Sequence, residues 1–430
     1  MMTQKLSWSA VNFFPHHSFH WQGTDGAQIL VHTLPEETYN SPALPRAVRK
    51  IDQNYREAGV SEHALMLFGI GDGSGGPGVE HLERLRRVQN LSGLCPVKQE
   101  TAKEFFGKWA AQSDAFPTWV GELYLEKHQG TFTTNAKTKL GNRRMEQGLR
   151  ELEFTSVLNM FSSAAAGGGG GSSTYPVADL DRLWKETLLY QFHDILPGSS
   201  IKRVYDECEV RYDAMLKELE ELIATQQQSI VGPIAAGVSS QSAAAVSLFN
   251  SLSWERGQWI FANGQWIFAN AAPLSASVIE LGGSATLLAA AACTLSSSAQ
   301  SIENDLLRVR FDGDGAIVSI FDKEHQREVL APGTRANRLR VYYDPGDPWD
   351  FPLDYADQSP RYMQLANAED VVDGPRVEMR QQYTLGMHTT LSQTVVLTAG
   401  SRRLDFATTS HWRGENLGNT QPQLDYHGHL

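Results

Sequence analysis

The stretch at residues 179–201 constrains this chain more than any other segment. Its first part carries apolar residues at three-and-four spacing, which predicts an amphipathic helix with one buried face. We expect Phe192 on that face and a helix end before Pro197-Gly198. His193 and Asp194 then occupy the last turn, where a rigid helix end can hold a metal ligand. On its own, a histidine beside an aspartate is more often a capping or solvated pair.

The longer string QFHDILPGSSI, at residues 191–201, resembles the signature of the zinc-dependent α-mannosidases of glycoside hydrolase family 38. The resemblance implies that His193 is a zinc ligand and that Asp194 lines the sugar pocket. It also implies a fold class, α/β plus all-β: the C-terminal part of an irregular α/β barrel, a three-helix bundle as middle domain, and a β-sandwich. We expect these domains at residues 1–92, 93–232 and 233–430.

Charge, apolar runs and cysteine content limit the classes of partner and the compartment that we expect for this chain. A net charge of −12 argues against nucleic acid, because a polyanion would be repelled. No apolar run reaches the length of a membrane span, and the first residues lack the apolar core of a secretory signal. Three cysteines far apart form no disulfide framework and favour a reducing compartment. We expect a cytoplasmic or vacuolar protein with no nucleic-acid or membrane partner, and we leave a homo-oligomer open.

The apolar run Ala64–Phe68 predicts a strand buried on both faces, followed by a glycine-rich loop at 69–77 and a helix from Val79. The loop contains a GxGxxG pattern, which is weak evidence for nucleotide binding, because Pro77-Gly78 delays the helix whose N-terminus would hold a phosphate. The loop also resembles the one that family 38 places beside its active site, and this implies that Asp72 lies near the substrate.

The string GELYLEKHQGT at residues 121–131 resembles the same family. It implies a carboxylate for the acid/base step, with Glu126 as the first choice and Glu122 as the second. The pattern does not decide between them, and a structural ion pair with Lys127 or Arg143 is an equally good explanation of either carboxylate.

Three further features carry less chemistry. His16, His17 and His20 are poorly arranged as a metal set, because neighbours on a strand point to opposite faces. The string GQWIFAN at 257–263 is repeated at 264–270, which suggests a local duplication without an assigned function. The low-complexity stretch at 162–173 is interpreted as an expanded loop between two helices.

The resemblance implies retaining hydrolysis of α-mannoside oligosaccharides by two carboxyl groups, with a zinc ion that grips the sugar. An open zinc site needs about three protein ligands, and the family takes two of them from a His-x-Asp motif. None of the 13 histidines here is followed two places later by aspartate. We therefore expect an incomplete α-mannosidase fragment that is inactive alone.

Two other functions compete with this interpretation. The chain could be a non-catalytic carbohydrate-binding or structural remnant of such an enzyme, which would use the β-sandwich and a residual pocket. An HD-type metal phosphohydrolase is a weaker alternative, because it requires further His and Asp ligands on neighbouring helices that the sequence does not offer.

Overall fold

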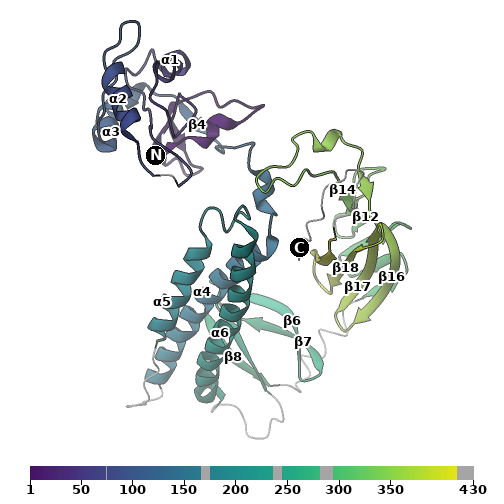
Figure 1. The fold of residues 1–430 in the computed structure, drawn as a ribbon. Coiled ribbons are helices and arrows are strands. Elements are labelled where there is room, and N and C mark those ends of the chain that lie inside the picture. Colours follow the sequence, from purple (N-terminus) through teal and green to yellow (C-terminus); the bar gives the residue numbers. More distant parts are fainter. Residues whose placement is uncertain (74, 166–174, 236–244, 281–293, 414–430) are drawn as a thin grey trace. The chain divides into compact units, whose positions relative to one another are not determined.

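The computed structural model describes residues 1–73, 75–165, 175–235, 245–280 and 294–413 (Figure 1). The chain divides into two compact units, Met1–Gln129 and Gly130–Leu430. Each unit has its own apolar cores. Each candidate site residue lies within one of the two units.

A mixed four-stranded sheet forms the centre of the first unit, in the order β1-β3-β2-β4. β2 and β3 are antiparallel and enclose the turn at residues 23–27. β1 lies parallel to β3, and β4 lies parallel to β2. The strands are β1 (Met2–Thr3), β2 (Ser18–Gln22), β3 (Gln28–Thr33) and β4 (Thr118–Val120).

Three helices accompany this sheet, and the second of them begins at Val79, where the sequence predicted a helix. They are α1 (Pro45–Asn54), α2 (Val79–Val88) and α3 (Ala102–Ala110). A buried polar network ties α3 and α1's end to the sheet: the Ser18 hydroxyl meets the Trp109 indole at 3.0 Å, the Tyr55 hydroxyl at 2.8 Å and the His32 ring at 3.0 Å. A buried network whose members all find partners specifies one arrangement of these elements.

The predicted buried strand at Ala64–Phe68 is wrong in this structure. The segment is extended and half-buried, and its one bridge joins Phe68 to Ser41. Residues Lys5–Trp8, near the N-terminus, form a short 3₁₀ turn. An apolar run shows that a segment is buried, but only a neighbouring strand with unused N–H and C=O groups turns it into part of a ladder.

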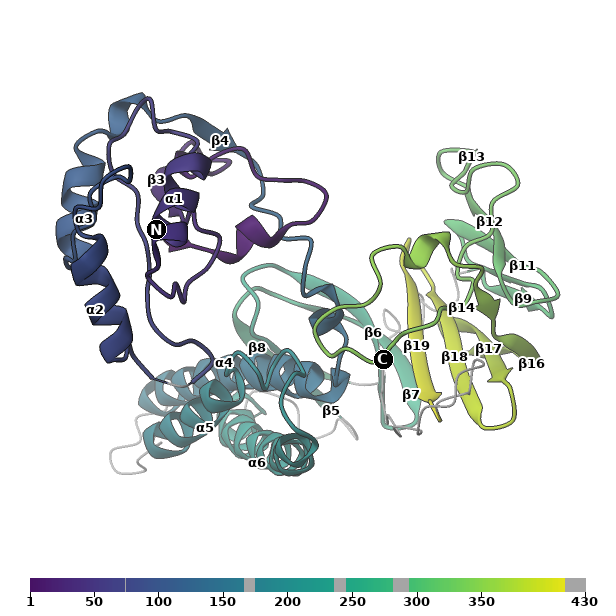
Figure 2. The same ribbon diagram turned by 45° about the horizontal axis from the view of Figure 1, so that its top comes forward.

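Three long helices open the second unit, and Figure 2 shows them side by side. Their shared core contains Leu149 and Leu152 from the first helix, Leu183 from the second, and Met215 and Leu219 from the third. The helices are α4 (Ala136–Ala165), α5 (Val177–Tyr190) and α6 (Lys202–Ala235), and most of the low-complexity stretch between α4 and α5 lies outside the described residues.

α5 ends earlier than the sequence predicted. The helix stops at Tyr190, and residues 191–198 form consecutive turns. Phe192 is 51% exposed, so its predicted place on the buried face is wrong. The core contacts of α5 come from Leu180, Leu183 and Thr187, and the change of backbone direction after Tyr190 takes Phe192 off that stripe.

The rest of the second unit is built from antiparallel strands. β5 (Ala245–Asn250) pairs with β8 (Ser275–Glu280), and β6 (Arg256–Ala262) pairs with β7 (Gln265–Ala271). Near the C-terminal end of the described residues, two larger sheets share one apolar core, in which Val309 and Phe311 of one sheet meet Val377 and Val395 of the other.

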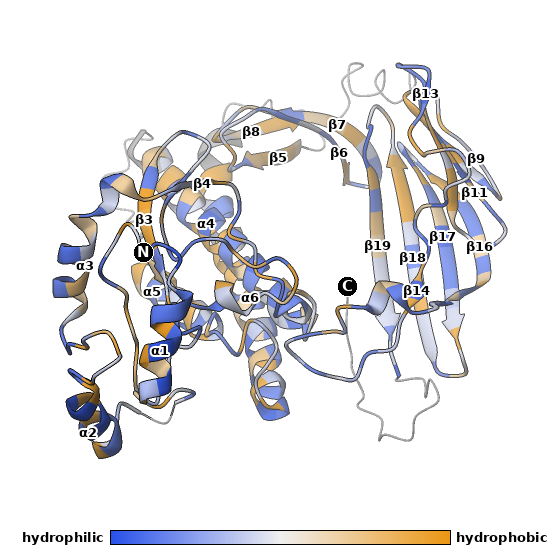
Figure 3. Cartoon of the chain, turned by 90° about the horizontal axis from the view of Figure 1, so that it is seen from above, coloured by the Kyte–Doolittle hydropathy of each residue, from blue (hydrophilic) through white to orange (hydrophobic). Residues whose placement is uncertain are grey.

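The first of these two sheets has the order β13-β12-β11-β10-β9 and the second β16-β17-β18-β19. β11 and β12 form an antiparallel hairpin around the turn at residues 312–315. Figure 3 shows orange and blue stretches following one another along β16 to β19, as expected for strands with one buried face. The strands are β9 (Ser296–Ser298), β10 (Ser301–Glu303), β11 (Leu307–Phe311), β12 (Ile317–Asp322), β13 (Arg327–Glu328), β14 (Arg340–Val341), β15 (Arg361–Tyr362), β16 (Gln364–Asp373), β17 (Arg376–Leu385), β18 (Thr389–Thr398) and β19 (Leu404–His411).

Candidate functional site

The His193–Asp194 pair lies on the turn after α5, which we call the HD corner (residues 191–200). The His193 side chain is 78% exposed, and its Nε2 lies 3.4 Å from Asp194 Oδ2. Asp194 is also held from its other side, because Ser199 Oγ donates to Asp194 Oδ1 at 3.0 Å and Tyr205 Oη donates to its main-chain oxygen at 2.9 Å. The corner thus fixes the aspartate and presents the imidazole to solvent.

Residues at the start of α4 donate hydrogen bonds to the HD corner. Lys139 Nζ donates to the Leu196 carbonyl at 2.7 Å and also to the Thr134 carbonyl. Asn135 Nδ2 donates to the Gly198 carbonyl at 3.0 Å. Burial lowers the pKa of Lys139 to about 8. Carbonyl oxygens at the end of a turn need donors, and Lys139 and Asn135 supply them here.

Gly198 allows the HD corner to approach the backbone of Thr134, just before α4. Its φ is +93°, and a Cβ atom added there would lie 2.4 Å from the Thr134 carbonyl oxygen. A side chain is therefore excluded both by the backbone conformation and by the contact. The same segment of chain meets a distant loop, since Gly130 N donates to the Trp349 carbonyl at 3.1 Å and Thr134 Oγ1 to the Pro348 carbonyl at 3.2 Å.

In the first unit, Glu126 is enclosed by the backbone of residues 11 and 12. The N–H groups of Val11 and Asn12 donate to its two carboxylate oxygens at 2.7 and 2.9 Å, and the Asn12 side-chain amide adds a third bond. Glu126 is 8% exposed. The Val11 N–H, followed by Asn12, lowers the pKa of Glu126. Three donors stabilise the ionised carboxylate, which is the opposite of what a general acid requires.

Asp72 lies on the glycine-rich loop of the first unit, exposed and with a φ of +55°. The Tyr39 hydroxyl donates to Asp72 Oδ1 at 3.1 Å, and this bond raises the pKa of Tyr39. Lys5 lies 3.6 Å above the Trp8 ring; burial lowers the pKa of Lys5, and the nearby Asp72 charge opposes that shift.

Trp8 connects the loops that carry the candidate carboxylates. Its ring lies 6.4 Å from that of Tyr39, the partner of Asp72, and 6.4 Å from that of His128, two residues after Glu126. The structure therefore brings the Asp72 loop and the Glu126 loop to the same short segment, residues 5–12. Glu122 lies on an exposed stretch, where its main-chain oxygen accepts a bond from Trp119 Nε1 at 3.2 Å.

The three histidines near the N-terminus have separate partners. His16 Nδ1 lies 3.1 Å from Glu57 Oε1, His17 Nδ1 accepts the Arg56 N–H at 3.1 Å, and His20 Nε2 lies 2.9 Å from the Ser113 carbonyl. Each of the three rings therefore has a polar partner of its own.

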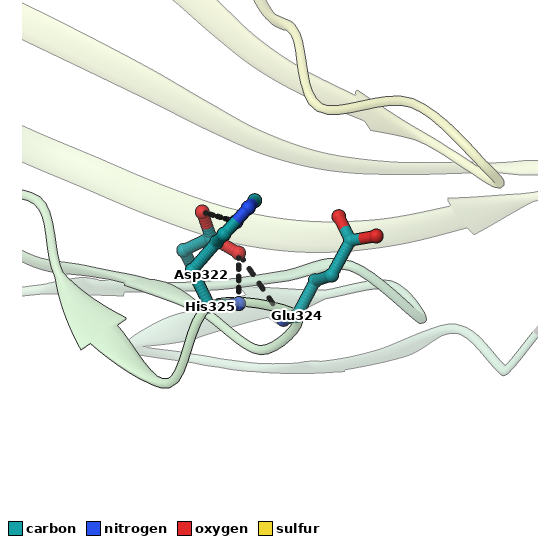
Figure 4. A group of neighbouring side chains, drawn as sticks. All are labelled: Asp322, Glu324 and His325. Carbon is teal, nitrogen blue, oxygen red and sulfur yellow. Dashed lines mark hydrogen bonds and ion pairs between the residues drawn. The ribbon is translucent and has the colours of Figure 1, made fainter.

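One group of described residues could hold a metal ion, and sequence reasoning missed it: Asp322, Glu324 and His325, on the turn between β12 and β13 (Figure 4). Asp322 already accepts the N–H groups of Glu324 and His325 at 3.1 Å and the His325 ring at 2.8 Å. Glu324 is paired with Arg402. These hydrogen bonds and this ion pair stabilise the turn, and they explain without a metal ion why the three side chains lie close together.

His193 belongs to no such group of three among the described residues. An open zinc site takes about three protein ligands. The HD corner by itself offers at most the imidazole and one carboxylate, which is fewer ligands than an open zinc site takes.

Among the described residues, no helix has both the length and the apolar character that crossing a bilayer requires.

Comparison with known proteins gives three family matches in chain order. They are the glycosyl hydrolases family 38 N-terminal domain at residues 1–122, the alpha mannosidase middle domain at 126–230, and the glycosyl hydrolases family 38 C-terminal domain at 302–424.

Relatives and solved structures agree with these matches. The chain is 32% identical to alpha-mannosidase 2C1 of Homo sapiens over 96% of its own length and 40% of that protein, and 35% identical to alpha-mannosidase of Saccharomyces cerevisiae over 59% and 23%. It thus spans about two fifths of the 2C1 relatives, human and mouse. The crystal structure of an alpha-mannosidase from Enterococcus faecalis V583 covers 92% of this chain with 56% of its own length, at a TM-score of 0.66 and 13% identity, which shows a shared fold. The chain belongs to glycosyl hydrolase family 38.

Proposed function

We propose that this chain forms part of an α-mannosidase that hydrolyses terminal α-mannosides with retention. The observation that carries the proposal is the ordered match to three family 38 domains along most of the chain. The relatives are named alpha-mannosidases, and α-mannoside oligosaccharides are the substrates proposed here. On domain limits, we propose a partial α/β barrel at 1–92, a helical middle domain at 93–232 and a β-sandwich at 233–430.

In this proposal the HD corner faces the sugar. His193 is offered to a divalent cation, and its exposure supports that role, because a ligand must be reachable. From the family resemblance we propose Asp194, beside His193, and Asp72, on the glycine-rich loop of the first unit, as substrate-binding residues. Zinc in such enzymes acts as a Lewis acid and a template for sugar hydroxyls. Because the described residues offer at most two ligands at the corner, we infer that further ligands are required for activity.

The two glutamates differ in what they can do. A general acid needs a raised pKa, whereas three N–H donors lower that of Glu126. We therefore propose that Glu126 holds the residue 5–12 segment in place and that Glu122, on its exposed stretch, is the carboxylate available for proton transfer. This reverses the order that the sequence pattern favoured.

A non-catalytic, carbohydrate-binding role is the second candidate, and the small ligand set at the HD corner is the observation that favours it. We place either form in the cytoplasm or vacuole, on the low cysteine content.

Hydrolysis of 4-nitrophenyl α-mannoside tests the proposal. We expect no release of nitrophenol by the 430-residue chain with zinc or cobalt, substoichiometric zinc by atomic absorption, and activity in a longer protein that spans the full length of the 2C1 relatives. In that protein His193→Ala should lower kcat/KM about 100-fold or more, because a ligand to the catalytic ion is lost. His325→Ala is the matched control and should leave the rate unchanged. Equal rates in His193→Ala and the parent would end the assignment.

A further inference from the structure

The tandem repeat at residues 257–270 folds onto itself. The first copy lies in β6 and the second in β7, joined by an Asn263-Gly264 turn in which both residues have positive φ, +47° and +76°. This is the turn that favours a two-residue hairpin. In the resulting register Trp259 is opposite Phe268, Ile260 opposite Ile267, and Phe261 opposite Trp266. Because the two copies are identical and antiparallel, each aromatic residue of one copy faces an aromatic residue of the other.

Alternation along the strands separates the hairpin into two faces. One face carries Ile260, Ile267 and Ala269; Ile267 and Ala269 are buried, and this face borders Leu248 and Phe249 of β5. We call the other side the aromatic face. It is formed by four residues: Trp259, Phe261, Trp266 and Phe268.

The aromatic face is partly open to solvent and held in shape. Phe261 is 61% exposed and Phe268 38%. Trp259 and Trp266 are half-buried, and Trp266 packs against Gly374. The ring centroids are 5.3 Å apart in each cross-strand pair, Trp259 with Phe268 and Phe261 with Trp266. Trp266 is fixed further, because its Nε1 donates to Asp373 Oδ1 at 3.1 Å. Exposed aromatic rings in a contiguous set on a rigid hairpin mark a binding surface more often than a packing accident.

The chemistry of the aromatic face selects its occupant. Its four residues carry no charge, and the exposed amides Asn270 and Asn263 lie at its two ends. The charged groups beside it are Asp373, which accepts the Trp266 N–H, and Arg376, whose guanidinium lies 5.8 Å from the centre of the Trp266 ring. A membrane surface would call for several Lys and Arg around the aromatic rings, whereas Arg376 shares the Trp266 ring with an aspartate. A neutral sugar offers C–H groups on one face, which suit the negative face of an aromatic ring, and hydroxyls at its rim, which suit amides.

We propose that the aromatic face of β6–β7 is a non-catalytic binding site for neutral mannose oligosaccharides. The hairpin lies between the matched family domains, at residues that none of the three covers. The choice of mannose rests on the proposed function; the stacking of a pyranose on these rings does not. A site that holds one part of a glycan chain raises the effective concentration of its other end at a catalytic centre on the same protein.

The test is binding of α-mannotriose to the 430-residue chain, followed by calorimetry and by tryptophan fluorescence. Phe261→Leu keeps the hairpin's apolar area and removes an exposed ring, so we expect about tenfold weaker binding. Phe261→Tyr should retain affinity. Trp254→Ala is the matched control, since Trp254 is 59% exposed and lies outside the hairpin; it should bind as the parent does.

The outcomes separate this inference from the proposed function. Unchanged binding in Phe261→Leu, with far-UV circular dichroism intact, would overturn the inference. Self-association by sedimentation that Phe261→Leu abolishes would assign the face to a second copy and would also overturn it. Loss of affinity in Phe261→Leu but not in His193→Ala supports the site, whether or not hydrolysis is observed in the longer protein.

Discussion

Glu126 in the first unit and His193 in the second are the two residues for which the motifs implied the most chemistry, and the structure surrounds them in opposite ways. Glu126 is buried and accepts three bonds from residues 11 and 12. His193 is exposed, and its one polar neighbour is Asp194 at 3.4 Å. A polar group whose bonding capacity is used inside the protein stabilises structure, whereas an open group on a fixed backbone can bind something else.

The largest expected effect tests whether the backbone of the HD corner is fixed. Gly198→Ala should lower the free energy of unfolding by about 4 kcal/mol or more, because an unfavourable φ is added to a collision with the Thr134 carbonyl. The matched control is Gly346→Ala, whose φ of +87° is similar and whose Cβ would meet nothing within 4 Å. Urea unfolding measures both. Similar losses in the two variants would mean that the corner is not tightly packed.

The next effect concerns acid stability and separates the two units. Burial lowers the pKa of His17 to about 4 and that of His32 to about 3. Both rings stay neutral in the folded state while the unfolded chain takes up protons near pH 6.5, so stability should fall as pH drops below 6.5, by about 1.4 kcal/mol per pH unit for each histidine. Each loss ends as pH reaches the lower, folded-state pKa.

Urea midpoints between pH 7 and pH 4.5 measure this dependence. His17→Gln should flatten it, and His193→Ala, which changes an exposed ring, should not. An identical slope in His17→Gln and the parent would contradict the assignment of acid sensitivity to the first unit.

A smaller effect tests the hydrogen bonds that Lys139 donates at the HD corner. Lys139→Met should destabilise the chain by about 1–3 kcal/mol, because the Leu196 and Thr134 carbonyls lose a shared donor. Lys137→Met is the control, since that lysine pairs with Glu209 at a partly exposed site. Thermal unfolding compares the two. If Lys139→Met is as stable as Lys137→Met, these hydrogen bonds contribute little to the corner.

The smallest expected effect distinguishes the two glutamates. Glu126→Gln keeps one oxygen to accept N–H bonds but places an amide against another donor, so its unfolding midpoint should fall modestly. Glu122→Gln, at an exposed position, should leave the midpoint unchanged and lower kcat of the longer protein. A stable Glu126→Gln with lost activity would return the acid/base role to Glu126.

Local pattern was sufficient for much of the fold. The helix predicted from Val79 is α2, and the amphipathic helix predicted in the first part of residues 179–201 is α5. Where prediction failed, the deciding neighbour was remote. Ala64–Phe68 has the composition of a strand but no ladder, and Phe192 continues an apolar stripe whose helix has already ended.

The candidate site divides in the same way. The strings around His193, Glu126 and Asp72 indicated family 38, and the domain matches confirmed the family. The sequence could not show that Glu126 accepts hydrogen bonds from Asn12 and Val11, which lie 114 and 115 positions earlier in the chain. Nor could it show that Lys139 donates a hydrogen bond to the carbonyl of Leu196, 57 positions later. No local signal pointed to either contact.

The order of residues by itself determined which segments are helices, which are hairpins and which family the chain joins, because hydrophobic periodicity, turn residues and motif strings are properties of a few neighbouring positions. Only the tertiary structure decided which polar groups are used up and which stay open. That depends on donors and acceptors brought together across tens of residues, and burial makes each unpaired group costly enough to fix the choice.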